Sequence, residues 1–168
     1  MKQISGRVAV VTGAGSGIGR ALCLELAQRG CDIALVDVDE DRLAAVRAEV
    51  EACGRKASTH LVDVSSREQM EALPGQVIAE HGAVHILVNN AGVSVNMTFE
   101  EQDVDDLEWI TGINYWGVMY GCKFFLPYLR QASEAHIVNM SSLAGLTGMK
   151  NQAIHVKKTF KVKKLSKF

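Results

Sequence analysis

The sequence predicts one α/β domain built on a doubly wound parallel sheet of about five strands. Short apolar runs alternate along the chain with longer segments whose apolar residues recur at helical spacing. Strands and helices that alternate in this way form parallel sheets with helices on both faces. At 168 residues, with 48% hydrophobic and 22% charged residues, the chain is long enough for one such domain and its core.

Five short apolar runs are expected to form the strands. They cover residues 8–11, 33–36, 57–62, 84–88 and 136–140.

Amphipathic segments between these runs are expected to form the helices. They begin at Ile18 and cover 39–53, 67–81 and 107–129, the last after an acidic start at 100–108. Pro74-Gly75 stands in the middle of segment 67–81. Because proline removes a helical hydrogen bond, we expect a kink or a break there.

A glycine cluster separates the first predicted strand from the first predicted helix. Its spacing is Gly13-x-x-x-Gly17-x-Gly19 rather than the common G-x-G-x-x-G. Hairpins and loops also use glycine, so the cluster alone does not decide the function. Its position favours a pyrophosphate site, because a helix N-terminus offers unpaired N–H groups and glycine allows close approach.

Asp37 ends the second predicted strand, 18 residues after Gly19. This is close to the roughly 20-residue offset at which a carboxylate reaches the ribose hydroxyls of NAD. The carboxylate would repel the 2′-phosphate of NADP, and neither Ser16 nor Val38 supplies a cation. The sequence therefore predicts NAD as the cofactor.

Polar residues stand where four of the predicted strands end: Asp37, Asp63, Asn90 and Ser142. The carboxyl ends of parallel strands share one edge of a sheet, and ligands bind at that edge. We therefore expect these four side chains to lie along one rim.

Charge is distributed unevenly. Residues 1–154 hold 12 Lys and Arg and all 19 Asp and Glu, whereas residues 155–168 hold six Lys and no acidic residue. We therefore divide the chain into a dinucleotide-binding domain, 1–154, and a lysine-rich tail, 155–168, that is not expected to fold. The tail could bind phosphates non-specifically, but no aromatic stacking platform accompanies it, so nucleic acid is not the expected partner.

The four cysteines form neither a zinc-ligand pattern nor a disulfide framework, and no metal site is predicted. No leader sequence and no run of about 18 apolar residues is found, so a cytoplasmic protein without a membrane span is expected.

Four motifs stand in the order of a known family. They are T-G-A-G-S-G-I-G at 12–19, N-N-A-G at 89–92, I-N-Y-W-G-V at 113–118 and I-V-N-M-S-S at 137–142. Together they resemble the short-chain dehydrogenase/reductase family of the classical type, from about Gly6 to Ile154. The resemblance implies a Rossmann-like fold that lacks the family's C-terminal strands here.

The resemblance also implies a reaction. In the family, hydride passes between the nicotinamide of NAD(P) and a secondary alcohol or ketone, and a Tyr assisted by a Lys moves the proton. Ser142 would hydrogen-bond the substrate oxygen, with Ser141 as the alternative, and Asn114 would anchor a water molecule. The implied cofactor-binding residues, with Asp63 and Val64 at the adenine, are Gly13, Ser16, Gly17, Ile18, Gly19, Asp37, Asp63, Val64, Asn90, Ala91 and Gly92.

The sequence departs from the family at the Tyr-x-x-x-Lys motif. His155 and Thr159 stand at its expected positions, and none of the three tyrosines has a Lys four residues later. His155 could act as a general acid or base, since the pKa of imidazole is near neutral. The family also continues with two further strands, which suggests that residues from about 155 arise from a shifted reading frame or an alternative splice.

Two hypotheses about function follow. The first is an NAD-dependent dehydrogenase/reductase of this family whose catalysis is lost or impaired. The alternative is a non-catalytic NAD-binding or regulatory protein that associates with full-length subunits through residues 109–129. The resemblance further implies a homo-oligomer through the helix around Asn114.

Overall fold

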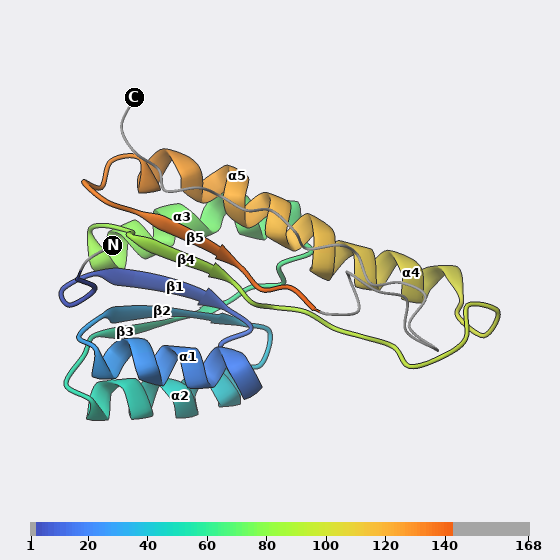
Figure 1. The fold of residues 1–168 in the computed structure, drawn as a ribbon, viewed down its shortest axis with the longest axis horizontal. Helices are drawn as coiled ribbons and strands as arrows, with labels where there is room; N and C mark the ends of the chain where they lie inside the picture. Colours follow the sequence, from blue (N-terminus) through green and yellow to red (C-terminus); the bar gives the residue numbers. More distant parts are fainter. Residues whose placement is uncertain (1–2, 143–168) are drawn as a thin grey trace.

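Five parallel strands form the sheet of the computed structural model, which describes residues 3–142. The strand order is β3-β2-β1-β4-β5 (Figure 1). The predicted fold class is confirmed, and each strand lies within two residues of its predicted bounds. The strands are β1 (Val8–Thr12), β2 (Asp32–Asp37), β3 (Ala57–Leu61), β4 (Ile86–Asn89) and β5 (His136–Asn139).

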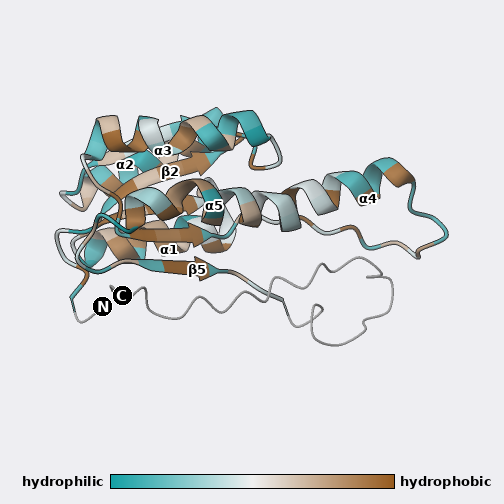
Figure 2. Ribbon diagram, turned by 90° about the horizontal axis from the view of Figure 1, so that it is seen from above, coloured by the Kyte–Doolittle hydropathy of each residue, from teal (hydrophilic) through white to brown (hydrophobic). Residues whose placement is uncertain are grey.

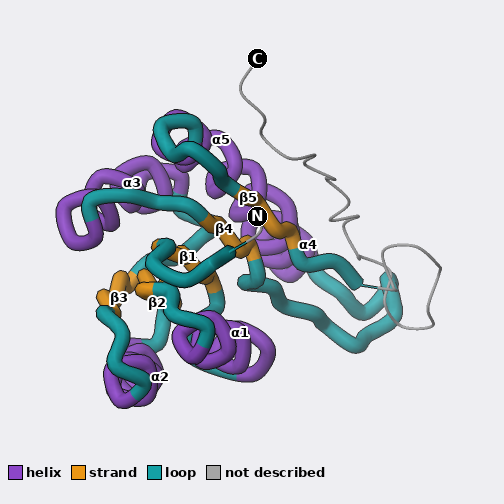
Figure 3. Tube along the Cα trace, turned by 60° about the vertical axis from the view of Figure 1, so that its left-hand side comes forward, coloured by secondary structure: helices purple, strands orange, loops and turns teal. Residues whose placement is uncertain are grey.

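Helices cover both faces of the sheet (Figure 3). Two of them, α1 (Gly17–Gln28) and α2 (Glu40–Ala52), lie on one face, and α3 (Arg67–His81) and α5 (Gly117–Leu129) lie on the other (Figure 1). The chain runs outward from β1 through β2 to β3 and then returns to β4 on the other side of β1. The carboxyl ends of β1 and β4 therefore flank the point at which ligands bind in sheets of this kind.

The core has two parts, one on each face of the sheet. Alternate residues of β1 divide between them: Val11 packs with residues of α1 and α2, and Val10 packs with residues of α3 and α5. The strand β2, whose four central residues are all buried, is accordingly brown along its ribbon in Figure 2. Since burying one such side chain contributes about 1.5–3 kcal/mol, this double packing holds the strand ends in place.

The break expected at Pro74-Gly75 does not occur, because α3 is continuous from Arg67 to His81. Pro74 is itself buried, together with Met70, Leu73 and Val77 on the same helix. A proline inside a helix costs about 3 kcal/mol, whereas each of these buried apolar side chains contributes about 1.5–3 kcal/mol. Packing against the sheet therefore outweighs the lost hydrogen bond.

The helix predicted over 107–129 differs from the structure in two ways. It begins at Val104, where Asp103 caps α4 (Val104–Thr111) by accepting a hydrogen bond from the N–H of Asp106 at 2.8 Å. It also contains a wide π-helical turn, η1 (Gly112–Trp116), between α4 and α5. Such turns occur frequently at functional sites. Among residues 3–142 no helix is long and apolar enough to cross a bilayer.

Candidate functional site

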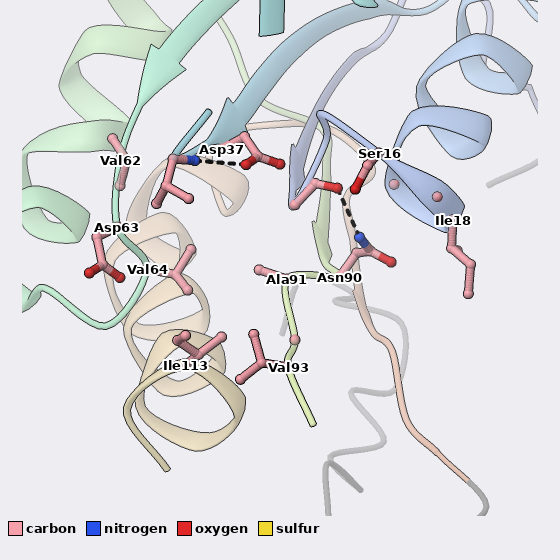
Figure 4. Close-up of a pocket in the computed structure, with 15 residues that line it drawn as sticks. Ser16, Ile18, Asp37, Val62, Asp63, Val64, Asn90, Ala91, Val93 and Ile113 are labelled. Carbon is pink, nitrogen blue, oxygen red and sulfur yellow. Dashed lines mark hydrogen bonds between the residues drawn. The ribbon is translucent and has the colours of Figure 1, made fainter. Parts of the chain in front are cut away.

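A cavity of about 380 Å³ opens at the carboxyl edge of the sheet. All eleven residues that the sequence analysis assigned to cofactor binding line it. Figure 4 shows Val62, Asp63 and Val64 on one side of this cavity and Ser16, Ile18 and Asn90 on the other. Its volume lies in the range of small-molecule sites, roughly 300–1,000 Å³.

The glycine turn forms one wall of the cavity. Gly13 and Gly17 have φ of +65° and +52°, a conformation that residues with a Cβ rarely adopt. A Cβ on Gly19 would overlap the carbonyl oxygen of Gly13 and lie 2.7 Å from Nδ2 of Asn90. The turn therefore requires glycine at these positions, for its backbone conformation at Gly13 and Gly17 and for close packing at Gly19.

Thr12 and Asn90 tie the glycine turn to the segment after β4. Oγ1 of Thr12 accepts hydrogen bonds from the backbone N–H groups of Asn90 and Ala91, each at 3.0 Å, and donates to the carbonyl of Val88 at 3.4 Å. Nδ2 of Asn90 donates to the carbonyls of Thr12 at 3.0 Å and Gly13 at 3.3 Å. These bonds fix two walls of the cavity relative to each other.

The carboxylate of Asp37 lies at the end of β2 and is held by the backbone. Its Oδ2 accepts from the N–H of Gly15 at 2.8 Å, and its Oδ1 accepts from Val38 at 2.8 Å and from Asp39 at 3.3 Å. A carboxylate has about four acceptor positions, so capacity remains for a ligand hydroxyl. The guanidinium of Arg42 pairs with Asp39 at 2.9 Å.

Asp63 is positioned by the turn that leads into α3. Its Oδ1 accepts from the N–H and the hydroxyl of Ser65, at 2.8 and 2.7 Å, and its own N–H donates to Oε1 of Gln69 at 2.8 Å. Val64 is buried beside it, and a Cβ on Gly117 would lie 2.9 Å from Cγ2 of Val64. The close approach of α5 therefore supports this wall.

The whole sequence was compared with models of known protein families. The model of the short chain dehydrogenase family matches residues 7–156. The chain belongs to the short-chain dehydrogenase family. This is a family of oxidoreductases.

Individual relatives agree with this membership. The protein named oxidoreductase SadH of Mycobacterium tuberculosis (strain ATCC 25618 / H37Rv) is 40% identical over 163 residues, which cover 97% of this chain and 59% of SadH. Cyclohexanol dehydrogenase of Acinetobacter sp. (strain SE19) is 34% identical and covers 89% of this chain and 60% of its own. The chain thus spans about 60% of the length of these relatives.

Solved structures show the same fold. A short-chain dehydrogenase/reductase from Burkholderia phymatum in complex with NAD has a TM-score of 0.88 at 38% identity and covers 94% of this chain and 56% of its own. A metagenomic short-chain oxidoreductase in complex with NADP has a TM-score of 0.84 at 34% identity, with 89% and 68% covered.

Of the residues that the sequence analysis assigned to catalysis, the two described ones, Asn114 and Ser142, do not line the cavity. Asn114 is buried in η1, where its Oδ1 accepts from the N–H of Val93 at 3.0 Å and its Nδ2 donates to the carbonyl of Val93 at 2.8 Å. Ser141 and Ser142 follow β5 and are exposed. His155, Thr159 and the tail 155–168 lie outside the described residues.

Sequence reasoning missed four apolar residues of the lining: Val38, Val62, Val93 and Ile113. Each of the first three is adjacent to a residue that was assigned, and that adjacency was the only signal in the sequence. Among the described residues, no three His, Cys, Asp or Glu side chains are grouped so that they could hold a metal ion.

Proposed function

We propose that this chain binds NAD in the cavity through a domain formed by residues 1–154, and that it is an NAD-dependent dehydrogenase/reductase with impaired catalysis. The observation that carries this proposal is the convergence of the eleven assigned residues on one cavity, with the Asp37 carboxylate at its edge. The Burkholderia phymatum relative in complex with NAD supports it.

The pyrophosphate of NAD fits the N-terminus of α1. Ser16 is the N-cap residue there, but its side chain makes no hydrogen bond to the first turn of the helix. N–H groups at a helix N-terminus, with the partial positive charge of the helix dipole, bind phosphate oxygens. Gly13 and Gly19 let the turn pack closely beside these groups, because a Cβ at either position would meet neighbouring atoms of the protein.

The charge of Asp37 favours NAD over NADP. At the end of β2 the carboxylate can accept hydrogen bonds from the adenosine ribose. Two unit charges about 5 Å apart repel each other by about 1–3 kcal/mol at effective dielectric constants of about 20–80. A 2′-phosphate would therefore bind about 5- to 150-fold more weakly. The metagenomic relative in complex with NADP makes this preference worth measuring directly.

When bound, NAD supplies a hydride acceptor at its nicotinamide ring. For this chain we propose a secondary alcohol or ketone as the substrate, with Ser142 as hydrogen-bond donor to its oxygen. Asn114 holds Val93 in the cavity wall and is a positioning residue. Asp63 and Val64 would contact the adenine.

Proton transfer is the step that we propose to be impaired. His155 and Thr159 stand where the family has its Tyr and Lys. General acid–base catalysis contributes about 10²- to 10⁴-fold to a rate, so turnover slower than that of family members by such a factor is expected.

A non-catalytic role is the second candidate, as an NAD-binding or regulatory protein that associates with full-length subunits. Exposed aromatic residues on α4 and η1 favour it: Trp109 and Trp116 are 49% and 46% exposed. Trp116 also stacks on Tyr120, which stacks on Phe124. The same surface would serve a homo-oligomer. For either candidate a cytoplasmic location is part of the proposal.

The test is to mix the full chain with NAD, and separately with NADP, and a panel of secondary alcohols that includes cyclohexanol. Formation of the reduced cofactor is followed together with cofactor binding. Saturable NAD binding with slow NADH formation supports the first candidate. Binding without any turnover supports the second. Turnover without a binding preference for NAD would contradict the assignment of Asp37.

A further inference from the structure

A serine hydroxyl lies between two histidine rings on the α3 face of the sheet. Oγ of Ser58 is 2.8 Å from Nε2 of His60 and 2.8 Å from Nε2 of His81. Ser58 and His60 belong to β3, and His81 is the last residue of α3. None of the three lines the cofactor cavity.

The hydrogen atoms of this group can be assigned from its surroundings. Nδ1 of His81 is buried and has no hydrogen-bond partner in the described part of the chain. A proton on that nitrogen would be an orphaned buried N–H donor, which proteins rarely contain. The His81 proton therefore lies on Nε2 and is donated to Oγ of Ser58. The single hydroxyl hydrogen of Ser58 is then donated to Nε2 of His60.

Gln76 of α3 lines the same cavity as His60, and its side chain raises the pKa of the His60 imidazole against the larger effect of burial, so we infer that it orients the ring. With Nε2 accepting from Ser58, the ring proton of His60 lies on Nδ1 and is available to the Gln76 carbonyl oxygen. Burial lowers the pKa of both histidines, so His60 is neutral near pH 7 and able to accept a proton. This is the arrangement of a nucleophile, a base and a group that orients the base.

Ser58 lies at the wall of a second cavity. A cavity of about 470 Å³ is lined by Ser58, His60 and Gln76 together with Arg47, Thr59 and Glu80. It shares no lining residue with the cofactor cavity. Ser58 and His60 are each 7% exposed, and we infer that a polar molecule of a few heavy atoms approaches Oγ of Ser58 from this cavity without entering the dinucleotide site.

A backbone donor lies next to the hydroxyl. The carbonyl of Lys56 and the N–H of Val62 bond to β2, at 2.9 and 3.0 Å. Because backbone groups alternate in direction along a strand, the N–H of Thr59 points away from β2, toward the outer side of β3. An amide directly after a nucleophile is a common donor to the oxyanion in acyl transfer.

We propose that Ser58, His60 and Gln76 form a second reactive centre that cleaves small, polar carboxylic esters. Oγ of Ser58 bonds to the ester carbonyl carbon while its proton passes to Nε2 of His60. The bond to the alkoxy oxygen then breaks, and the alcohol leaves with that proton. Water attacks the acyl group on Ser58, gives one proton to His60, and releases the acid as the proton returns to Oγ. The Thr59 N–H donates to the oxyanion in both steps.

The experiment uses the full chain without nicotinamide cofactor. Hydrolysis of p-nitrophenyl acetate is measured, and the serine reagent diisopropyl fluorophosphate is added before peptide mass spectrometry. The reagent is expected on Ser58. Ser58→Ala and His60→Gln should each lower both rates about 100-fold, as expected for loss of a nucleophile or its base. Leu61→Ala, at an exposed position of the same strand that lines neither cavity, is the matched control and should stay within about twofold.

The pH profile separates a base from a structural partner. The labelling rate of the native chain should rise as His60 loses its proton, and His60→Gln should remove that rise. A thermal melt accompanies each variant, and NAD affinity should not change. Absence of label on Ser58, or an equal rate of ester hydrolysis in Ser58→Ala, would show that the hydroxyl only bridges the two rings.

A second variant keeps the proposal testable if Ser58→Ala unfolds. Ser58→Cys places a thiol against the same base, and the exposed Cys53 of the same molecule is its internal reference. The thiol at position 58 should react with iodoacetamide at least tenfold faster than Cys53 near neutral pH. A slower reaction than that of Cys53 would overturn the proposal, whatever the state of the NAD site.

Discussion

Gly19 offers the sharpest test of the cofactor cavity, through the substitution Gly19→Ala. The added Cβ would overlap the carbonyl oxygen of Gly13 and lie 2.7 Å from Nδ2 of Asn90. Neither neighbour is the free end of a flexible side chain, because Nδ2 of Asn90 already donates to the carbonyls of Thr12 and Gly13. The substitution therefore forces the glycine turn and the segment after β4 apart.

The size of the effect follows from this crowding. Overpacking costs about 1–3 kcal/mol, and the backbone contact places Gly19→Ala at the upper end of that range. In a chain of this size about 3 kcal/mol lowers the Tm by about 6–12 °C. Displacement of the turn should also weaken NAD binding by about 100-fold, since about 1.4 kcal/mol corresponds to a factor of ten.

The assay is differential scanning calorimetry combined with NAD titration, and Gly75→Ala is the matched control. A Cβ on Gly75 meets no atom within 4 Å, and alanine favours a helix by up to about 1 kcal/mol. That variant should be as stable as the native chain or more so, with unchanged NAD affinity. If Gly19→Ala instead binds NAD like Gly75→Ala, the glycine turn does not contact the cofactor.

Three further outcomes are expected. Gly121→Ala places a Cβ on Oδ1 of Asn89 and should lower the free energy of unfolding by about 1–3 kcal/mol. Urea titration measures this change, and an unchanged midpoint of unfolding would contradict the packing of α5 on β4. Burial lowers the pKa of His60 and His81, so the unfolded chain binds more protons than the folded chain. The free energy of unfolding should therefore fall as the pH drops below about 6.5. His81→Gln should make this dependence on pH weaker. Burial raises the pKa of Cys23 to about 12, so iodoacetamide should modify the exposed Cys53 and spare Cys23 until the chain unfolds, as peptide mass spectrometry would show.

Much of the fold could be predicted because three of its strands, β1, β2 and β4, are short and mostly apolar runs. Buried parallel strands carry this pattern, and the glycine turn and strand-end acids mark the edge at which they finish. The course of α3 through Pro74 could not be predicted from local preference, because burial of Met70, Leu73 and Val77 decides it. The π-helical turn at 112–116 has no local signal either, since tertiary contacts of Asn114 with Val93 accompany it.

The candidate site also contains residues that the sequence predicts and residues that it does not. Asp37 and the glycines could be assigned because their residue types and spacing carry the chemistry of dinucleotide binding. Ile113 could not, because it reaches the cavity from a distant helix. The contact of Ser58 with His60 and His81 could not be predicted from the sequence either, because His81 reaches β3 only when α3 packs on the sheet.

The most direct test is a calorimetric titration of the full chain with NAD and, separately, with NADP. The account predicts saturable binding of NAD and binding of NADP at least about fivefold weaker, the lower bound set by the charge of Asp37. Asp37→Ser, which removes that charge, should bring the two affinities within about threefold of each other. Absence of NAD binding, or tighter binding of NADP to the native chain, would contradict the assignment of the cavity.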